Sequence, residues 1–112
     1  RVLLSGRTPE ELDAFLARAT ITKRTPKTTV DRAAIARAVR TAAAEGYAIV
    51  DEELELGLRS IAVPICDRTG RVLAAINVST QSSRLTGLEM RDQILPHLQD
   101  ARRRIEDFVA LQ

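Results

Sequence analysis

The chain has 112 residues, a formal net charge of +2 and only 3% aromatic residues. A chain of this length forms at most one domain. The small charge and the few aromatic side chains argue against a nucleic-acid-binding surface, where basic residues gather with rings that stack on bases. The longest apolar run, Val72 to Ile76, is far shorter than the roughly 20 residues that span a bilayer. We therefore expect a cytoplasmic protein with no membrane contact, and the single Cys66 suits a reducing compartment.

Helix signals dominate the first part of the chain, which begins inside a predicted helix. Thr8, followed by Pro9 and then by Glu11, is typical of a helix N-terminus. Asp31 caps the next helix, and Gly46 ends it at the position where a left-handed residue is favoured. The stretch between these two helices is rich in Thr, Lys and Pro and predicts an irregular connection.

Strand signals follow in the middle of the chain. We predict a short strand over 47–50, pairing that resumes at Leu58 and continues over 61–66, and a strand over 71–79. Asp67 and Gly70 bracket the four-residue turn of a hairpin between the last two strands. A charged connection, residues 51–56, joins the first strand to the second.

The last predicted strand carries the first candidates for a binding site. Its side chains alternate, so Asn77 and Ser79 share one face. A strand this apolar is expected to be covered on both faces, and polar groups on a covered face need partners from the protein or from a ligand. We therefore expect these two side chains to face one enclosed pocket. The opposite face of this strand carries Val72, Ala74, Ile76 and Val78.

A capping box at Thr86 and Glu89 opens the last helix, and Pro96 predicts a break near Leu95. The apolar positions expected in this helix are Leu88, Ile94, Leu98, Ile105, Phe108 and Val109. The whole pattern predicts an α/β or α+β domain with helices packed on a mostly antiparallel sheet.

Catalytic and metal-binding signals are weak. His97 lies far in the sequence from every candidate nucleophile, and a triad of Ser79, His97 and Asp51 could be written only by free choice. The sequence holds no His/Cys cluster with metal-ligand spacing and no Gly-rich phosphate loop. We therefore expect no enzyme activity, no metal and no cofactor.

The middle of the chain resembles a known family. An ordered set of short segments carries the resemblance: Gly46–Tyr47, 51–53, 57–64, Asp67 with Gly70, and 75–79. It resembles the second half of the effector-binding domain of the IclR family of bacterial transcription regulators. The nearest branch is the one that controls aromatic-acid catabolism by the protocatechuate (β-ketoadipate) route. Supporting matches at Arg1–Leu4 and 94–96 extend the resemblance to nearly the whole chain.

This resemblance implies a GAF-like fold in which a curved sheet holds a small ligand. Residues 1–112 would be the C-terminal part of the effector-binding domain, without the N-terminal winged helix-turn-helix and the first half of the sensor domain. The effector would be a small organic acid, aromatic or dicarboxylic. Operator DNA would be bound through the missing N-terminal domain, and the protein would form a homodimer or homotetramer.

The resemblance also implies roles for individual residues. Asn77 and Ser79 match positions that bind effector oxygens, and Ser60 matches one at the pocket mouth. All three could instead bond neighbouring groups of the protein. Arg59 could hold a carboxylate or pair with the acidic run 51–53, and we favour the pairing. Asp51 would recognise a hydroxyl or hold Arg59, although at the family's acidic pocket residue this chain has Val50 at one matching place and Asp51 at the next.

Two other functions are compatible with the same residues. One is a free-standing GAF-like binding domain of another signalling protein, and the other is a small hydrolase. A helix-turn-helix upstream in the full gene would distinguish the regulator from the first alternative. Turnover of a bound ester would favour the second.

Overall fold

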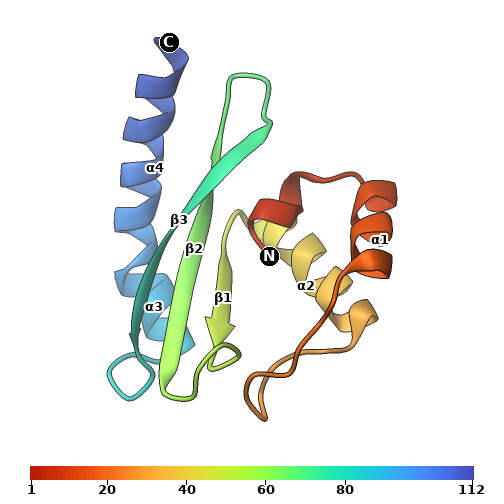
Figure 1. Cartoon of the computed structure of the whole chain (residues 1–112). Helices are drawn as coiled ribbons and strands as arrows, with labels where there is room; N and C mark the ends of the chain where they lie inside the picture. The colour runs from red at the N-terminus through yellow and green to blue at the C-terminus, as the bar shows by residue number, and fades with distance from the viewer.

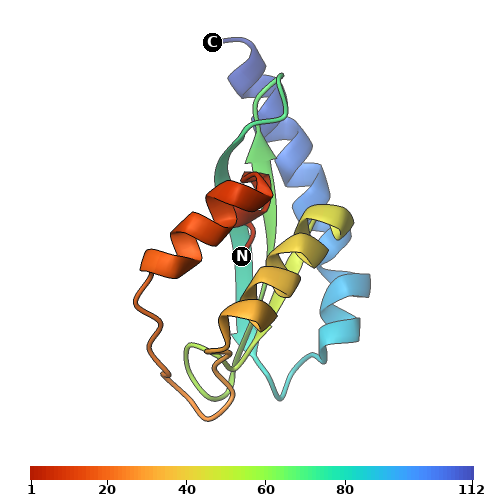
Figure 2. The same cartoon turned by 90° about the vertical axis from the view of Figure 1, so that its right-hand side faces the viewer.

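The computed structural model describes residues 1–112 and confirms the α+β class. Helices lie on both sides of one sheet: α3 and α4 on one side, and η1, α1 and α2 on the other (Figure 1). Figure 2 shows α1 and α2 side by side in front of the sheet. The elements in chain order are the 3-10 helix η1 (Leu3–Gly6), α1 (Pro9–Arg18), α2 (Arg32–Glu45), β1 (Ala48–Asp51), β2 (Leu58–Cys66), β3 (Val72–Gln81), α3 (Gly87–Gln93) and α4 (Leu95–Ala110).

The predicted helix boundaries are confirmed where capping residues set them. Thr8 and Thr86 each form a complete capping box, so the side chain and the backbone of each residue bond to the glutamate three positions on. Gly46 ends α2 with a φ of 79°, a left-handed conformation that favours glycine. The break expected before Pro96 falls at Ile94, between α3 and α4. The start of the chain differs from the prediction, because it forms only the single turn of η1.

The sheet is antiparallel and three-stranded, in the order β1-β2-β3. Its register aligns Val50, Ser60 and Ser79 in one row across the three strands. The hairpin turn between β2 and β3 is closed by Asp67, whose Oδ1 accepts hydrogen bonds from the backbone N–H groups of Thr69 at 2.9 Å and Arg71 at 3.0 Å.

One face of the sheet carries the main core. Ile61 and Val63 of β2 are completely buried and pack with Met90 of α3 and Leu98 of α4. The neighbouring residues on the same strands point to the opposite face, which α3 and α4 do not cover. A second, smaller core joins α1 to α2. Its buried members are Leu12, Leu16, Ala36 and Val39.

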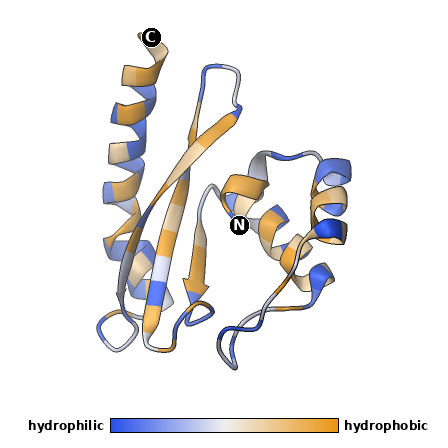
Figure 3. Ribbon diagram, in the orientation of Figure 1, coloured by the Kyte–Doolittle hydropathy of each residue, from blue (hydrophilic) through white to orange (hydrophobic).

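The structure corrects the expectation that β3 is covered on both faces. This strand lies at the edge of the sheet, and Leu73 and Val78 are 49% and 37% exposed. The helical stripe predicted for the C-terminus is also only partly buried: Leu98 is buried, whereas Leu88, Ile105 and Phe108 are exposed. Apolar residues recur along β3 and on successive turns of α4 (Figure 3). No helix has both the length and the apolar character needed to cross a membrane.

Candidate functional site

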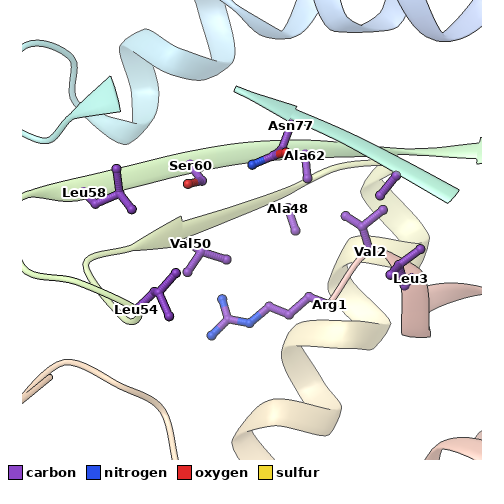
Figure 4. A pocket seen from close by; sticks show the side chains of 11 residues that line it. Arg1, Val2, Leu3, Ala48, Val50, Leu54, Leu58, Ser60, Ala62 and Asn77 are labelled. Carbon is purple, nitrogen blue, oxygen red and sulfur yellow. The ribbon is translucent and has the colours of Figure 1, made fainter. Parts of the chain in front are cut away.

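A pocket of about 290 Å³ opens on the sheet face that α3 and α4 leave free. Strands β1, β2 and β3 form its wall, and the first residues of the chain and the β1–β2 connection form its sides (Figure 4). Ligand pockets for drug-sized molecules start at roughly 300 Å³, so this volume suits a small ligand. Eight of the eleven lining residues are hydrophobic. The lining residues are Arg1, Val2, Leu3, Ala48, Val50, Leu54, Leu58, Ser60, Ala62, Ala75 and Asn77.

The strands supply two of the three polar residues of the lining, Ser60 and Asn77, both of which the sequence had indicated. The Oγ atoms of Ser60 and Ser79 lie 2.7 Å apart, and the Asn77 Nδ2 donates to the Ser79 Oγ at 3.5 Å. The three predicted side chains therefore form one row on this face of the sheet. Their hydroxyl and amide groups can both donate and accept hydrogen bonds, as ligand oxygens require.

The enclosure predicted for this site is not present in the chain. Asn77 and Ser79 are both exposed, and Ser79 does not line the pocket. The helices on this side do not cover this part of β3: η1 contacts the strand, but its Gly6 lies against Val72, near the opposite end. The two side chains share a face as expected, but that face is open.

The other two candidates, Asp51 and Arg59, are not among the residues that line the pocket. Each is next to a lining residue on its strand, so its side chain points to the opposite face. The Nε of Arg59 donates to the Asp51 Oδ1 at 3.1 Å. Its Nη1 donates to the backbone oxygens of Leu85 and, at 3.0 Å, Ser82. Arg59 thus pairs with Asp51, the structural role that the sequence favoured, and it also ties β2 to the β3–α3 connection.

Val50 and Asp51 are the two places on β1 that the resemblance matches to an acidic residue of the family, and Val50 is the one that faces the pocket. It lines the pocket directly beside Ser60, its partner in the register of β1 and β2. Because Val50 and not Asp51 faces the pocket, the lining is apolar at this point. Alternation along β1, combined with the register to β2, would have identified Val50 and Ala48 as lining residues.

Sequence reasoning missed Arg1, the only charged residue of the lining. Its Nη1 donates to the backbone oxygen of Ile49 at 3.4 Å, and its Nη2 forms an ion pair with the Glu53 carboxylate. The other oxygen of that carboxylate accepts from the backbone N–H of Thr29 at 2.8 Å. No periodic pattern marks Arg1, because the contacts that place it come from residues about fifty positions away.

Glu52, which precedes Glu53 in the β1–β2 connection, joins this connection to the one between α1 and α2. It has a φ of 57°, which is uncommon for a residue other than glycine. Its carboxylate accepts from the Ser82 hydroxyl at 2.6 Å and pairs with the Lys27 Nζ at 3.1 Å. The hydrogen bond from Ser82 has the largest effect, and together with Lys27 it holds the pKa of the Glu52 carboxyl below its ordinary value. The hydroxyl of Thr25, a buried residue, donates to the Glu52 backbone oxygen at 2.6 Å.

The chemistry of a hydrolase or of a metal centre is not assembled here. His97 is exposed on α4, and α4 packs on the sheet face opposite Ser60 and Ser79. No group of three or more His, Cys, Asp or Glu residues lies close enough to hold a metal ion. Cys66 is a free, partly buried thiol at the end of β2.

An apolar pocket with a few convergent polar groups, set on the open face of an antiparallel sheet, defines a small-molecule-binding domain. Comparison with known proteins shows the family to which this domain belongs. Residues 1–107 match the family described as bacterial transcriptional regulator IclR, C-terminal. The chain therefore belongs to the IclR family of bacterial transcriptional regulators, in agreement with the resemblance in the sequence. Membership of a regulator family also agrees with the prediction that the chain is not an enzyme.

Individual relatives support this assignment. The chain is 44% identical over 103 residues to the Pca regulon regulatory protein of Pseudomonas putida, which matches 92% of this chain and 35% of that protein. A transcriptional regulator from Rhodococcus sp. RHA1 has the same fold, with a TM-score of 0.94 at 35% identity, over 98% of this chain and 45% of that one. The inducer-binding domain of a PobR double mutant from Acinetobacter, in complex with 3-hydroxybenzoic acid, gives a TM-score of 0.88 at 28% identity, over 94% of this chain and 60% of that one.

Proposed function

We propose that residues 1–112 are the C-terminal part of an effector-binding domain that senses a small organic acid in a cytoplasmic bacterial transcription regulator. The observation that carries the proposal is the pocket, in which Arg1, Ser60 and Asn77 are the only polar residues among apolar ones. Such a lining buries a ring or short chain and holds a few oxygens at fixed places. An acid fits the positive charge of Arg1.

The relatives support the aromatic class of effector. The PobR domain that shares this fold was crystallised with 3-hydroxybenzoic acid. That ligand combines a ring, one carboxylate and one hydroxyl, and the present pocket offers matching groups of each kind. The ring would lie against Val50, Ala62 and their apolar neighbours, and the oxygens would bond to the polar row formed by Ser60, Asn77 and Ser79.

The rest of the regulator belongs to the proposal as well. The chain spans 60% of the matched PobR domain and 35% of the Pca regulon regulatory protein. We infer that an N-terminal winged helix-turn-helix binds operator DNA and that the first half of the sensor domain completes the pocket wall. Effector binding would act on a homodimer or homotetramer by its different affinity for two subunit arrangements.

A thermal-shift and calorimetry screen tests the sensing function. The panel is benzoate, 3-hydroxybenzoate and adipate, each with its uncharged amide. A ligand at 100 times its dissociation constant should add about 2.7 kcal/mol to the free energy of unfolding, which raises the melting temperature by several degrees. Binding of at least one acid with 1:1 stoichiometry is the expected result. The failure of all three acids to bind would contradict the proposal.

A further inference from the structure

We propose that Arg1 is the carboxylate-binding residue of the pocket and that Glu53 is its resident counter-ion, with which an acid effector must compete. This inference rests on the proposed sensing function and adds to it the residue pair that sets affinity and selects for charge. Neither residue belongs to the polar row on the strands.

The placement of Arg1 carries the first half of the proposal. Its side chain is 20% exposed and extends along the pocket opposite the strands, with the guanidinium near Leu54, while Ser60 and Asn77 project from the strands above (Figure 4). A guanidinium has five N–H donors in a fixed plane. Those not bonded to the Ile49 oxygen or to Glu53 remain for a ligand oxygen. Because the rest of the lining carries no charge, Arg1 is the one group there that can neutralise a carboxylate.

The contacts of Glu53 carry the second half. Its carboxylate is 16% exposed and bridges Arg1 to the backbone N–H of Thr29. The Thr28 hydroxyl donates to the Glu53 backbone oxygen, so this residue is fixed on both its backbone and its side chain. A carboxylate held this firmly beside a cation lowers the attraction that the cation exerts on a second anion. Removing its charge should therefore strengthen the binding of an acid.

Two substitutions in the intact protein separate this pairing from a structural tie. Arg1→Met keeps an aliphatic side chain and removes the charge. We expect it to weaken binding of the acids in the panel at least about tenfold, the loss expected for a hydrogen bond to a charged group, and to leave the amides within about twofold. Glu53→Gln keeps the shape of the side chain and removes its negative charge. It should strengthen binding of the acids several-fold and leave binding of the amides unchanged.

A purely structural role of the Arg1–Glu53 pair gives a different pattern, because loss of a tie would weaken acids and amides together. Melting temperatures without ligand show whether each variant is folded, and Ser60→Ala serves as the control that should lose affinity for acids and amides alike. Equal losses of acid and amide in Arg1→Met would overturn the assignment of Arg1. Weaker binding of the acids to the Glu53→Gln variant would contradict the proposed competition between Glu53 and the effector. If no acid binds the unaltered protein, both the proposed sensing function and the Arg1–Glu53 proposal that rests on it are wrong.

Discussion

At the scale of single residues, Asn77 is the polar side chain of β3 that lines the pocket. It lies opposite Ala62 in the β2–β3 register and beside Ser79, to whose hydroxyl it donates. The apolar lining around it cannot replace a hydrogen bond to the ligand. We therefore expect Asn77 to orient a bound effector as well as to add to its affinity.

Asn77→Ala should weaken binding of the acid that the panel identifies by about 1 to 3 kcal/mol, the usual loss for a hydrogen bond to a charged group. Isothermal calorimetry measures this change directly. Gln81→Ala provides a matched control, because Gln81 is an exposed amide on the same strand and the same face but outside this pocket. An unchanged dissociation constant in Asn77→Ala would show that the effector contacts other groups.

Glu52, in the β1–β2 connection, should make the stability of the protein depend on pH. Its folded-state pKa lies below the ordinary value of 4.5, because the carboxylate bonds to Ser82 and Lys27. The stability that these contacts contribute is thus fully present above that ordinary value. It is lost as the pH falls through the lower pKa of the folded protein.

We expect Glu52→Gln to lower the free energy of unfolding at neutral pH and to have a progressively smaller effect as the carboxyl becomes protonated. Urea denaturation of both proteins at several pH values below and above 4.5 measures the difference. Glu55→Gln in the same connection is the control, since no ion pair or side-chain hydrogen bond involves Glu55 in the structure. A constant difference at all pH values would contradict the role of the Glu52 charge.

At the scale of elements, short helices depend on their caps. Helix α3 has only seven residues, yet it carries Met90, which is completely buried in the main core. Helices this short are not stable on their own, so capping and tertiary packing must hold them together. The Thr86 capping box supplies the first of these: the Glu89 backbone N–H donates to the Thr86 hydroxyl at 3.1 Å, and the Thr86 backbone N–H donates to the Glu89 carboxylate at 3.0 Å.

Thr86→Ala should therefore lower the free energy of unfolding by about 1 kcal/mol, the typical loss for a hydroxyl cap. Thermal or urea denaturation gives the value. Thr22→Ala, at an exposed threonine without a side-chain hydrogen bond in the structure, should change it by less than about 0.5 kcal/mol. Equal effects of the two substitutions would show that the cap contributes nothing.

The sequence predicted these elements well because their signals are local. Thr8, Gly46 and Thr86 act within a few residues of themselves, and period-two alternation along β3 places Asn77 and Ser79 on one face. The position of Arg1 and the exposure of β3 depend instead on contacts across the whole fold. Arg59 lies between these cases, since a charge pairing could be expected from the acidic run but its backbone acceptors in the β3–α3 connection could not.

At the scale of the whole molecule, one apolar surface remains without a partner. Ile105, Phe108 and Leu111 repeat at intervals of three along the C-terminal end of α4 and the residue after it, and all three are exposed. Phe108 is 64% exposed and Leu111 is 81% exposed. Contiguous exposed apolar residues of this kind mark surfaces that another segment covers, and an edge strand such as β3 offers unpaired backbone groups beside them.

We expect the first half of the sensor domain to cover this surface, which makes the effect of a substitution depend on chain length. In the 112-residue chain, Phe108→Asn removes a mostly exposed ring and should change the free energy of unfolding by less than about 0.5 kcal/mol. In a protein that contains the whole domain, the same change should cost about 3 kcal/mol or more, because the ring is then buried. Urea denaturation of both lengths measures the contrast, with Asp107→Asn on the neighbouring exposed position as the control. If Phe108→Asn were equally mild in the longer protein, the first half of the sensor domain would not cover this surface.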